Sequence, residues 1–227
     1  MPTFTLRPYL RPHLRPHLRP SLRPGLGAPA VAAGVLLAVL PATLSLAAEV
    51  PGPLGPENVP LEVGKPLAPA STAAQGQTVD GIRCDSAEQV AYHVHTRLTV
   101  YVDGVLRPIP AGIGIVRPVA KQTARGPFDE ATDCYYWVHV HVQDGIIHIE
   151  SPTRRTYTLG QFFDLWHQPL SRAQVASARG PMVVFVNGHR YGGNPRAITL
   201  GSHKVVQIDV GSPVVAPKTV DWSITGL

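Results

Sequence analysis

Three histidines and a carboxylate stand close together in the stretch CYYWVHVHVQDGIIHIE, which runs from Cys134 to Glu150. His139 and His141 occupy alternate positions, and His148 and Glu150 do the same a few residues later. Neutral imidazole nitrogens and a carboxylate oxygen form a ligand set that suits Zn²⁺ or Cu²⁺. The residue types therefore predict a transition-metal site, provided that the fold brings the four side chains together.

An Asp-Gly pair at 144–145 divides this stretch into two apolar-rich halves, which predicts a β-hairpin closed by a two-residue turn. That register places His148 opposite His141 and Glu150 opposite His139, with opposed Cβ atoms ~4.5–5.5 Å apart. Because side chains alternate along a strand, the four polar groups share one face. The other face is the predicted core face, formed by Val138, Val140, Val142, Ile147 and Ile149.

A second histidine pair lies upstream in YHVHTRLTVYVDG, where His93 and His95 alternate with other side chains. The only two cysteines, Cys84 and Cys134, precede the two histidine segments. In an exported chain two cysteines most often pair, and this pair would close a loop worth roughly 4 kcal/mol. A disulfide would bring both segments to one end of the sheet. The sequence thus predicts a Cys84–Cys134 bridge and makes His93 and His95 candidates for further ligands.

Other interpretations of the histidines remain open. On the outward face of a sheet they can be solvated polar side chains without any ligand role. Three protein ligands that leave a fourth position to water describe instead a metal-dependent hydrolase or hydratase. The upstream pair separates carrier from enzyme: a closed storage or delivery site is expected if His93 or His95 reaches the cluster.

The remaining patterns predict an α+β fold, mostly antiparallel β-sheet built of β-hairpins with one main helix. Asp-Gly within 101–106 and Asn-Gly within 185–191 predict two more hairpins, and the alternating KVVQIDV at 204–210 predicts a last strand. Thr158 followed by Gln161 predicts a capping box at the start of the helix. The apolar helix face is predicted at Leu159, Phe162, Phe163 and Trp166.

The segment VVFVNGHRYGGNPRAITLGSHKVVQIDVG, placed after a helix, resembles the second half of a β-grasp (ubiquitin-like) domain in layout. The combination HVH, LTVYVDG, IPAGIGI, CYYWVHVH, DGIIHIESP and YTLGQFFDLW is similar to a family of exported bacterial proteins of uncharacterised function, with paired HxH motifs. The second resemblance spans nearly the whole domain. It implies export and a single domain, and no particular activity.

The first 80 residues differ in composition from the rest. Residues 1–48 combine a basic, proline-rich repeat with an Ala/Leu/Val-rich run, which predicts a signal peptide or an N-terminal anchor, with 29–48 as a possible membrane tether. Residues 49–80 are rich in Pro, Gly and Ala and predict an extended linker. A single globular α+β domain is expected over 81–227.

The net charge of +5 does not indicate a nucleic-acid partner. Residues 1–48 hold five of the 20 Lys and Arg and none of the 15 Asp and Glu, so the remainder is neutral overall. No basic stripe is left for a phosphate backbone. The sequence therefore favours an exported protein, periplasmic, secreted or anchored outside the cytoplasm, that binds Cu²⁺ or Zn²⁺ for sequestration, delivery or sensing. A metal-dependent enzyme and a tethered β-grasp-like interaction module with incidental histidines are the alternatives.

Overall fold

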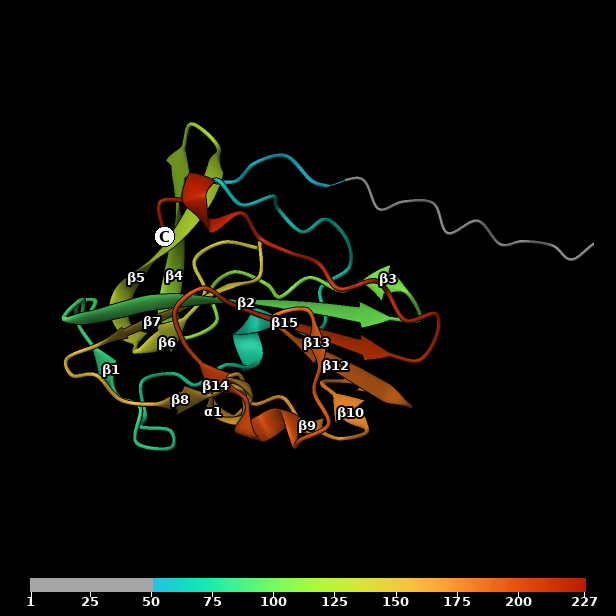
Figure 1. The fold of residues 1–227 in the computed structure, drawn as a ribbon. Coiled ribbons are helices and arrows are strands. Elements are labelled where there is room, and N and C mark those ends of the chain that lie inside the picture. The colour runs from blue at the N-terminus through green and yellow to red at the C-terminus, as the bar shows by residue number, and fades with distance from the viewer. Residues whose placement is uncertain (1–50) are drawn as a thin grey trace, which may run out of the picture. The chain divides into compact units, whose positions relative to one another are not determined.

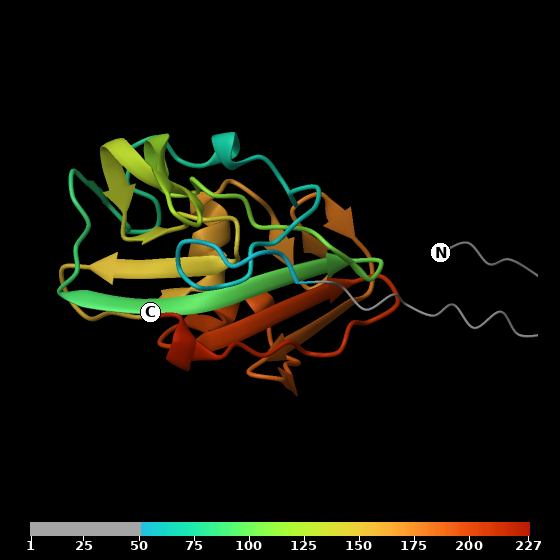
Figure 2. The same cartoon turned by 90° about the horizontal axis from the view of Figure 1, so that it is seen from above.

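A seven-stranded sheet carries both histidine segments, in the strand order β13-β12-β15-β2-β7-β6 with β3 paired to β2. Figure 2 shows the long β2 between β7 (yellow) and β15 (red). Neighbours run antiparallel except β2 and β15, which are parallel. The strands are β2 (Tyr92–Val102), β3 (Val105–Leu106), β6 (Val138–His139), β7 (Ile146–Ser151), β12 (Met182–Val186), β13 (His189–Arg190) and β15 (Lys204–Val210).

The computed structural model describes residues 51–227, so the predicted signal peptide or anchor and the possible tether at 29–48 lie outside the described residues. Beyond the main sheet there are three smaller ones, ordered β1-β5-β4, β11-β10-β9 and β14-β8. Their strands are β1 (Cys84–Asp85), β4 (Ile115–Thr123), β5 (Gly126–Tyr136), β8 (Tyr157–Thr158), β9 (Leu170–Ser171), β10 (Gln174–Val175), β11 (Ala178–Arg179) and β14 (Thr199–Leu200). Single 3₁₀ turns lie at η1 (Ala70–Thr72), η2 (Pro195–Ala197) and η3 (Trp222–Ile224).

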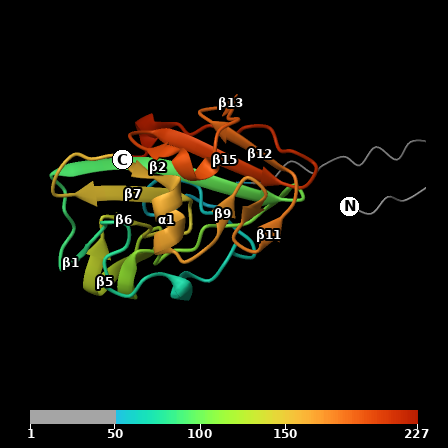
Figure 3. The same cartoon turned by 90° about the horizontal axis from the view of Figure 1, so that it is seen from below.

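The described residues contain one α-helix, α1 (Leu159–Leu165), which packs on one face of the main sheet (Figure 3). The predicted capping box is confirmed, because Thr158 Oγ1 accepts from the Gln161 amide and the Gln161 side chain accepts from the Thr158 amide. The helix buries its apolar side against the predicted core face of the strands. This core includes Leu98, Val100, Val138, Ile147, Ile149, Phe162, Phe163, Val206 and Ile208. The mostly antiparallel α+β class is thus observed.

Two of the predicted hairpins have the expected turns. Asp103 and Gly104 both have positive φ, 52° and 74°, between β2 and β3. Asn187 and Gly188 likewise have positive φ between β12 and β13. Strand β2, the first strand of the 101–106 hairpin, is one of the central strands of the main sheet.

The prediction of a two-residue turn at 144–145 is wrong. Residues 140–145 form a loop, and His139 pairs with His148, a shift of two residues from the predicted register. The pairing of β6 with β7 ends at His139, because the Val140 amide donates to the Ile113 carbonyl and the Val140 carbonyl accepts from the Gly112 amide. Asp144 then closes the loop by accepting a hydrogen bond from the Ile146 amide at 2.9 Å. A shift of two residues preserves which face each side chain occupies.

Residues 51–80, which the sequence predicts to be an extended linker, contain turns, a β-bridge from Leu54 to Pro60 and the 3₁₀ turn η1, and they pack on the domain. Val59, Leu67, Ala73 and Ala74 are buried against the domain, and residues 51–227 belong to one unit. The Glu62 amide bonds to the Gln143 carbonyl at 2.8 Å, which holds the first part of this segment across the sheet face opposite α1, whereas the Ala74 amide bonds to the Leu165 carbonyl of α1. In Figure 1 the first part of this segment (blue) runs above β2, on the same side as the C-terminal segment. Prolines remove amide donors without preventing such packing.

The Cys84–Cys134 disulfide is present, with the two Cα atoms 5.4 Å apart. It joins β1 to β5, the second strand of the β4–β5 hairpin that projects from the domain (Figure 1). Disulfides persist in oxidising compartments, so the bridge agrees with a location outside the cytoplasm. Within residues 51–227, none of the helices is long and apolar enough to cross a bilayer.

Candidate metal centre

Strands β6, β7 and β2 place five of the six predicted site residues on the sheet face opposite α1, and the loop after β6 brings His141 to them. His148 on β7 stands between His139 on one side and His95 on the other. In the next row Glu150 stands beside His93. The sheet register itself therefore joins the two histidine segments, and the disulfide is not needed for that purpose. The site residues are His93, His95, His139, His141, His148 and Glu150.

Burial rules out the interpretation of the central residues as solvated surface groups. His139 is 0% exposed, His141 2%, His148 4% and Glu150 3%. His95 is also buried, while the His93 side chain is 39% exposed at the rim. Burying polar groups costs free energy unless they are paired or bound to metal, so the burial of this cluster indicates a specific role for its side chains.

Two segments outside the main sheet cover the cluster. Phe128 on β5 stacks on the His141 ring, with centroids 4.2 Å apart and planes inclined by 15°. Glu57, from the segment over the sheet, is 7% exposed and lies against His148. A cavity of about 400 Å³ opens onto the cluster from solvent. It is lined in part by Glu88, Phe128, Tyr135, Gly226 and Leu227.

Backbone carbonyls determine which nitrogen of His139 and His141 carries hydrogen. His139 Nδ1 lies 2.7 Å from the Tyr136 carbonyl oxygen, and His141 Nδ1 lies 2.6 Å from that of Asp129. A carbonyl only accepts, so each Nδ1 must donate. In the neutral rings both Nε2 atoms then present a lone pair. Metal-ligating histidines are held in the same way, by donating their other ring N–H to a carbonyl or a carboxylate.

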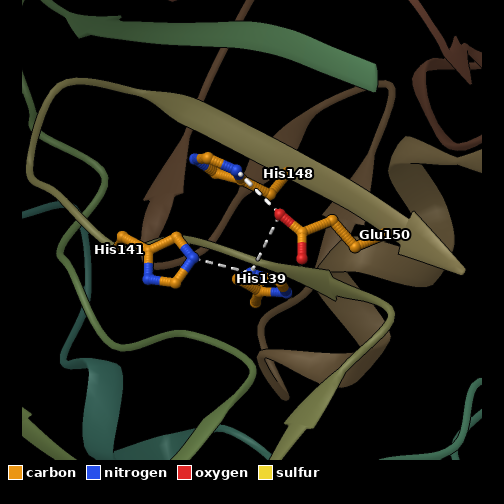
Figure 4. A group of neighbouring side chains, drawn as sticks. All are labelled: His139, His141, His148 and Glu150. Carbon is orange, nitrogen blue, oxygen red and sulfur yellow. Dashed lines mark hydrogen bonds and ion pairs between the residues drawn. The ribbon is translucent and has the colours of Figure 1, made fainter. Parts of the chain in front are cut away.

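The two Nε2 atoms face each other at 2.9 Å (Figure 4). Two lone pairs at this distance repel, so a cation must lie beside them, either a proton that turns one ring into an imidazolium or a metal ion. A proton on His139 is disfavoured, because burial, and then the nearby His141 and His148, hold its pKa well below the usual range. The arrangement thus suits a metal ion that accepts both lone pairs.

His148 is oriented by two carboxylates. Its Nε2 lies 2.7 Å from Glu57 Oε1 and its Nδ1 lies 3.3 Å from Glu150 Oε1. Burial alone lowers the pKa of His148, but these carboxylates outweigh it and raise the pKa to about 10. Without metal His148 therefore holds both ring protons. If a metal replaces the Nδ1 proton, Glu57 still holds Nε2–H and fixes the ring.

The donor atoms are spaced as a metal needs them. Zn–N bonds of ~2.0–2.1 Å in a tetrahedron put ligand atoms ~3.3–3.4 Å apart. Here His139 Nε2 is 2.9 Å from His141 Nε2 and 3.9 Å from Glu150 Oε1, and Glu150 Oε1 is 3.3 Å from His148 Nδ1. All four donors lie within 4.8 Å of one another. This spacing is compatible with one ion held by all four residues.

Glu150 connects the central group to the upstream pair. Its Oε1 lies 3.0 Å from His93 Nε2 as well as 3.3 Å from His148 Nδ1, while its Oε2 has no hydrogen-bond partner. Burial alone would raise the pKa of Glu150, but the hydrogen bonds with His148 and His93 lower it well below the usual range. Glu150 is thus a carboxylate with a free oxygen at the centre of the site.

Sequence reasoning missed the residues that complete the site from other segments. Glu57 lies in a proline-rich stretch without periodicity, and nothing in the sequence connects it to His148. Glu88 Oε1, 3.3 Å from His141 Nε2, comes from the loop before β2. The Asp129 and Tyr136 contacts use backbone carbonyls, which carry no residue-type signal at all. The predicted partner of Glu150 was His139, whereas the nearest ring is that of His93.

Comparison with known proteins adds no relative: no protein-family model, curated protein or solved structure matches the chain. The resemblance to exported proteins with paired HxH motifs therefore stays a prediction. The structure shows that the buried His and Glu groups could hold a metal ion.

Proposed function

We propose that this chain is an exported metal-binding protein that holds Cu²⁺ or Zn²⁺ through His139 Nε2, His141 Nε2, His148 Nδ1 and Glu150. One observation carries the proposal: two buried Nε2 atoms face each other at 2.9 Å while backbone carbonyls occupy both Nδ1 atoms. No neutral pairing satisfies both rings. A divalent ion of the kind that prefers imidazole ligands does.

Sequestration or delivery is the role that the donor count supports best. Three histidines and one carboxylate already supply the four ligands of a closed tetrahedral site, and His93 stands 3.0 Å from the same carboxylate. Between the two metals, Cu²⁺ binds a given nitrogen and oxygen site more tightly than Zn²⁺, so availability in the compartment decides. The disulfide supports an oxidising compartment.

Calorimetric titration of untagged, metal-free protein with Cu²⁺ or Zn²⁺ tests the proposal. His141→Ala and His148→Ala should each lower the affinity by more than ~100-fold, because even supporting residues of metal sites cost 10–100-fold. His189→Ala is the matched control, since His189 is exposed on β13. His203 is less suitable, because it bonds to Leu227 at the cavity. Equal affinities in all four proteins would contradict the proposal.

The cavity favours a metal-dependent hydrolase or hydratase as a second candidate. It opens onto the histidines from solvent, and Glu88 stands at its mouth, about one-third exposed and 3.3 Å from His141 Nε2. An enzyme must keep one coordination position for water. Spectroscopy of the Co²⁺-substituted protein separates the two: exchange of a bound water with azide indicates the open site, and an unchanged spectrum indicates the carrier.

The strand order also supports a β-grasp-like layout. In the order β7-β2-β15-β12-β13, the central pair β2 and β15 are the first and last of these strands along the chain, and they lie parallel. The helix α1 follows β2 and β7, which are the first two of these strands along the chain. The segment 103–145, with the β4–β5 hairpin, is then an insertion between the first two strands of that layout. An interaction module with incidental histidines is the less favoured role, because incidental histidines have no reason to be buried.

A further inference from the structure

His93 and His95 form a second group beside the four proposed ligands. Their ring centroids are 4.5 Å apart, and the His95 and His148 centroids are 4.6 Å apart. One donor atom from each of the three lies within 4.8 Å of the others. The same row of the sheet puts Glu150 opposite His93, with Nε2 3.0 Å from Oε1.

His95 makes this group more than an extension of the first. It is 5% exposed, and its Nε2 has no hydrogen-bond partner. An unpartnered buried nitrogen is costly and calls for an explanation, such as an ion that it would ligate. The four donors of the first site are already sufficient for one ion, so the His95 nitrogen is not needed there.

Glu150 is placed to serve both groups. Its Oε1 contacts His148 of the first group and His93 of the second, while Oε2 is unpartnered. A carboxylate has two oxygens, and in two-metal centres with ions ~3.5–4 Å apart such groups lie between the ions. Both groups also line the same cavity, so ions could reach either of them from solvent.

We propose that the chain binds two divalent transition ions, the second held by His93, His95 and a Glu150 carboxylate shared with the first. This inference rests on the proposed metal-binding function and deepens it. The second ion is expected to bind more weakly, because the His93 side chain is 39% exposed and donates to no carbonyl comparable to those behind His139 and His141. The centre is then a bridged pair rather than two independent sites.

Titration of the untagged, metal-free full domain with Cu²⁺, followed by electron paramagnetic resonance, tests the proposal. Wild-type protein should bind two ions per chain in two steps. The second step should remove much of the signal intensity through spin coupling. His95→Gln should bind one ion with the first-step affinity within a few-fold and show an uncoupled signal. The matched control is His189→Gln, which should bind two coupled ions.

Each other result contradicts a distinct part of the account. One ion in both wild-type protein and His95→Gln overturns the second site and leaves the first intact. If wild-type protein binds one ion and His95→Gln binds none, His95 is a ligand of a single centre, and the proposed pair of ions is overturned. Two ions with uncoupled signals overturn the shared carboxylate. No binding by wild-type protein overturns the proposed function itself.

Discussion

Replacing His141 by glutamine should separate metal binding from folding. When both rings are neutral, the His141 and His139 Nε2 atoms are both acceptors, 2.9 Å apart. A glutamine side chain is of similar reach and carries an amide NH₂ that can donate to His139 Nε2. The substitution therefore turns a repulsive contact into a hydrogen bond, while it removes the bond from His141 Nδ1 to the Asp129 carbonyl.

The two changes nearly cancel in the absence of metal. A buried hydrogen bond contributes about 0.5–1.5 kcal/mol, so one gained and one lost leave the free energy of unfolding within about 1 kcal/mol of wild type. For a domain of this size that is within about 2–4 °C in Tm. With metal at about 1,000 times the wild-type Kd, binding adds about 4 kcal/mol, or about 8–16 °C. The variant should lose most of that increase.

Thermal denaturation of both proteins, with chelator and with added Zn²⁺, measures the four values. Metal-free Tm values that agree within a few degrees, with a Zn²⁺-induced rise only in wild type, are expected. A metal-free variant that unfolds more than about 10 °C below wild type would refute the lone-pair argument, because it would show that His141 stabilises the fold by itself. An equal Zn²⁺-induced rise in both would refute its role as a ligand.

Three further predictions concern pH, the disulfide and one glycine. Metal-free protein should be most stable near neutral pH. Burial, and then the charges of neighbouring histidines, lower the pKa of His95 to about 3. The free energy of unfolding should therefore fall by up to ~1.4 kcal/mol per pH unit as the pH drops below 6.5. Stability should also fall as the pH rises from 6.5 towards 10, because the unfolded chain releases the His148 proton at a lower pH than the folded protein does. Urea titrations that give the same stability at every pH would contradict both pH expectations. Unreduced protein should show no free thiol on labelling, and reduction should cost about 4 kcal/mol in the same assay. Gly114→Ala should lower stability and metal affinity together, because Gly114 has φ +75° and an added Cβ would collide with the Val138 carbonyl oxygen and stand 2.9 Å from His139 Cβ. Gly126→Ala is the control: an added Cβ there has no atom within 4 Å, so the metal affinity should be unchanged.

The shared face of the histidines could be predicted, because an error of two residues in register leaves every side chain on the same face, whereas their burial under Glu57 and Phe128 could not. The true pairing of His139 with His148 differs from the prediction by two residues, and an even shift keeps every side chain on its face. The helix was predicted well for a similar reason: the Thr158 cap and the apolar spacing are local signals.

Contacts between distant segments could not be predicted. The loop at 140–145 forms because Val140 bonds to Ile113 and Gly112, and such backbone pairing leaves no pattern in the sequence of either segment. Glu57 reaches His148 across 91 positions of the chain from a stretch that composition alone makes look like a linker. The parallel pairing of β2 with β15 is equally long-range. Local periodicity carries no information about which strands become neighbours.

The most direct test of the central claim is metal analysis combined with X-ray absorption on untagged protein purified from the exported fraction. The account predicts at least one Cu or Zn ion per chain. It also predicts a first shell of nitrogen and oxygen at ~2.0–2.2 Å with about three imidazoles. Protein that retains no such ion, and that takes up none when Cu²⁺ or Zn²⁺ is added, would contradict the account. A bound ion without imidazole scattering would contradict it equally.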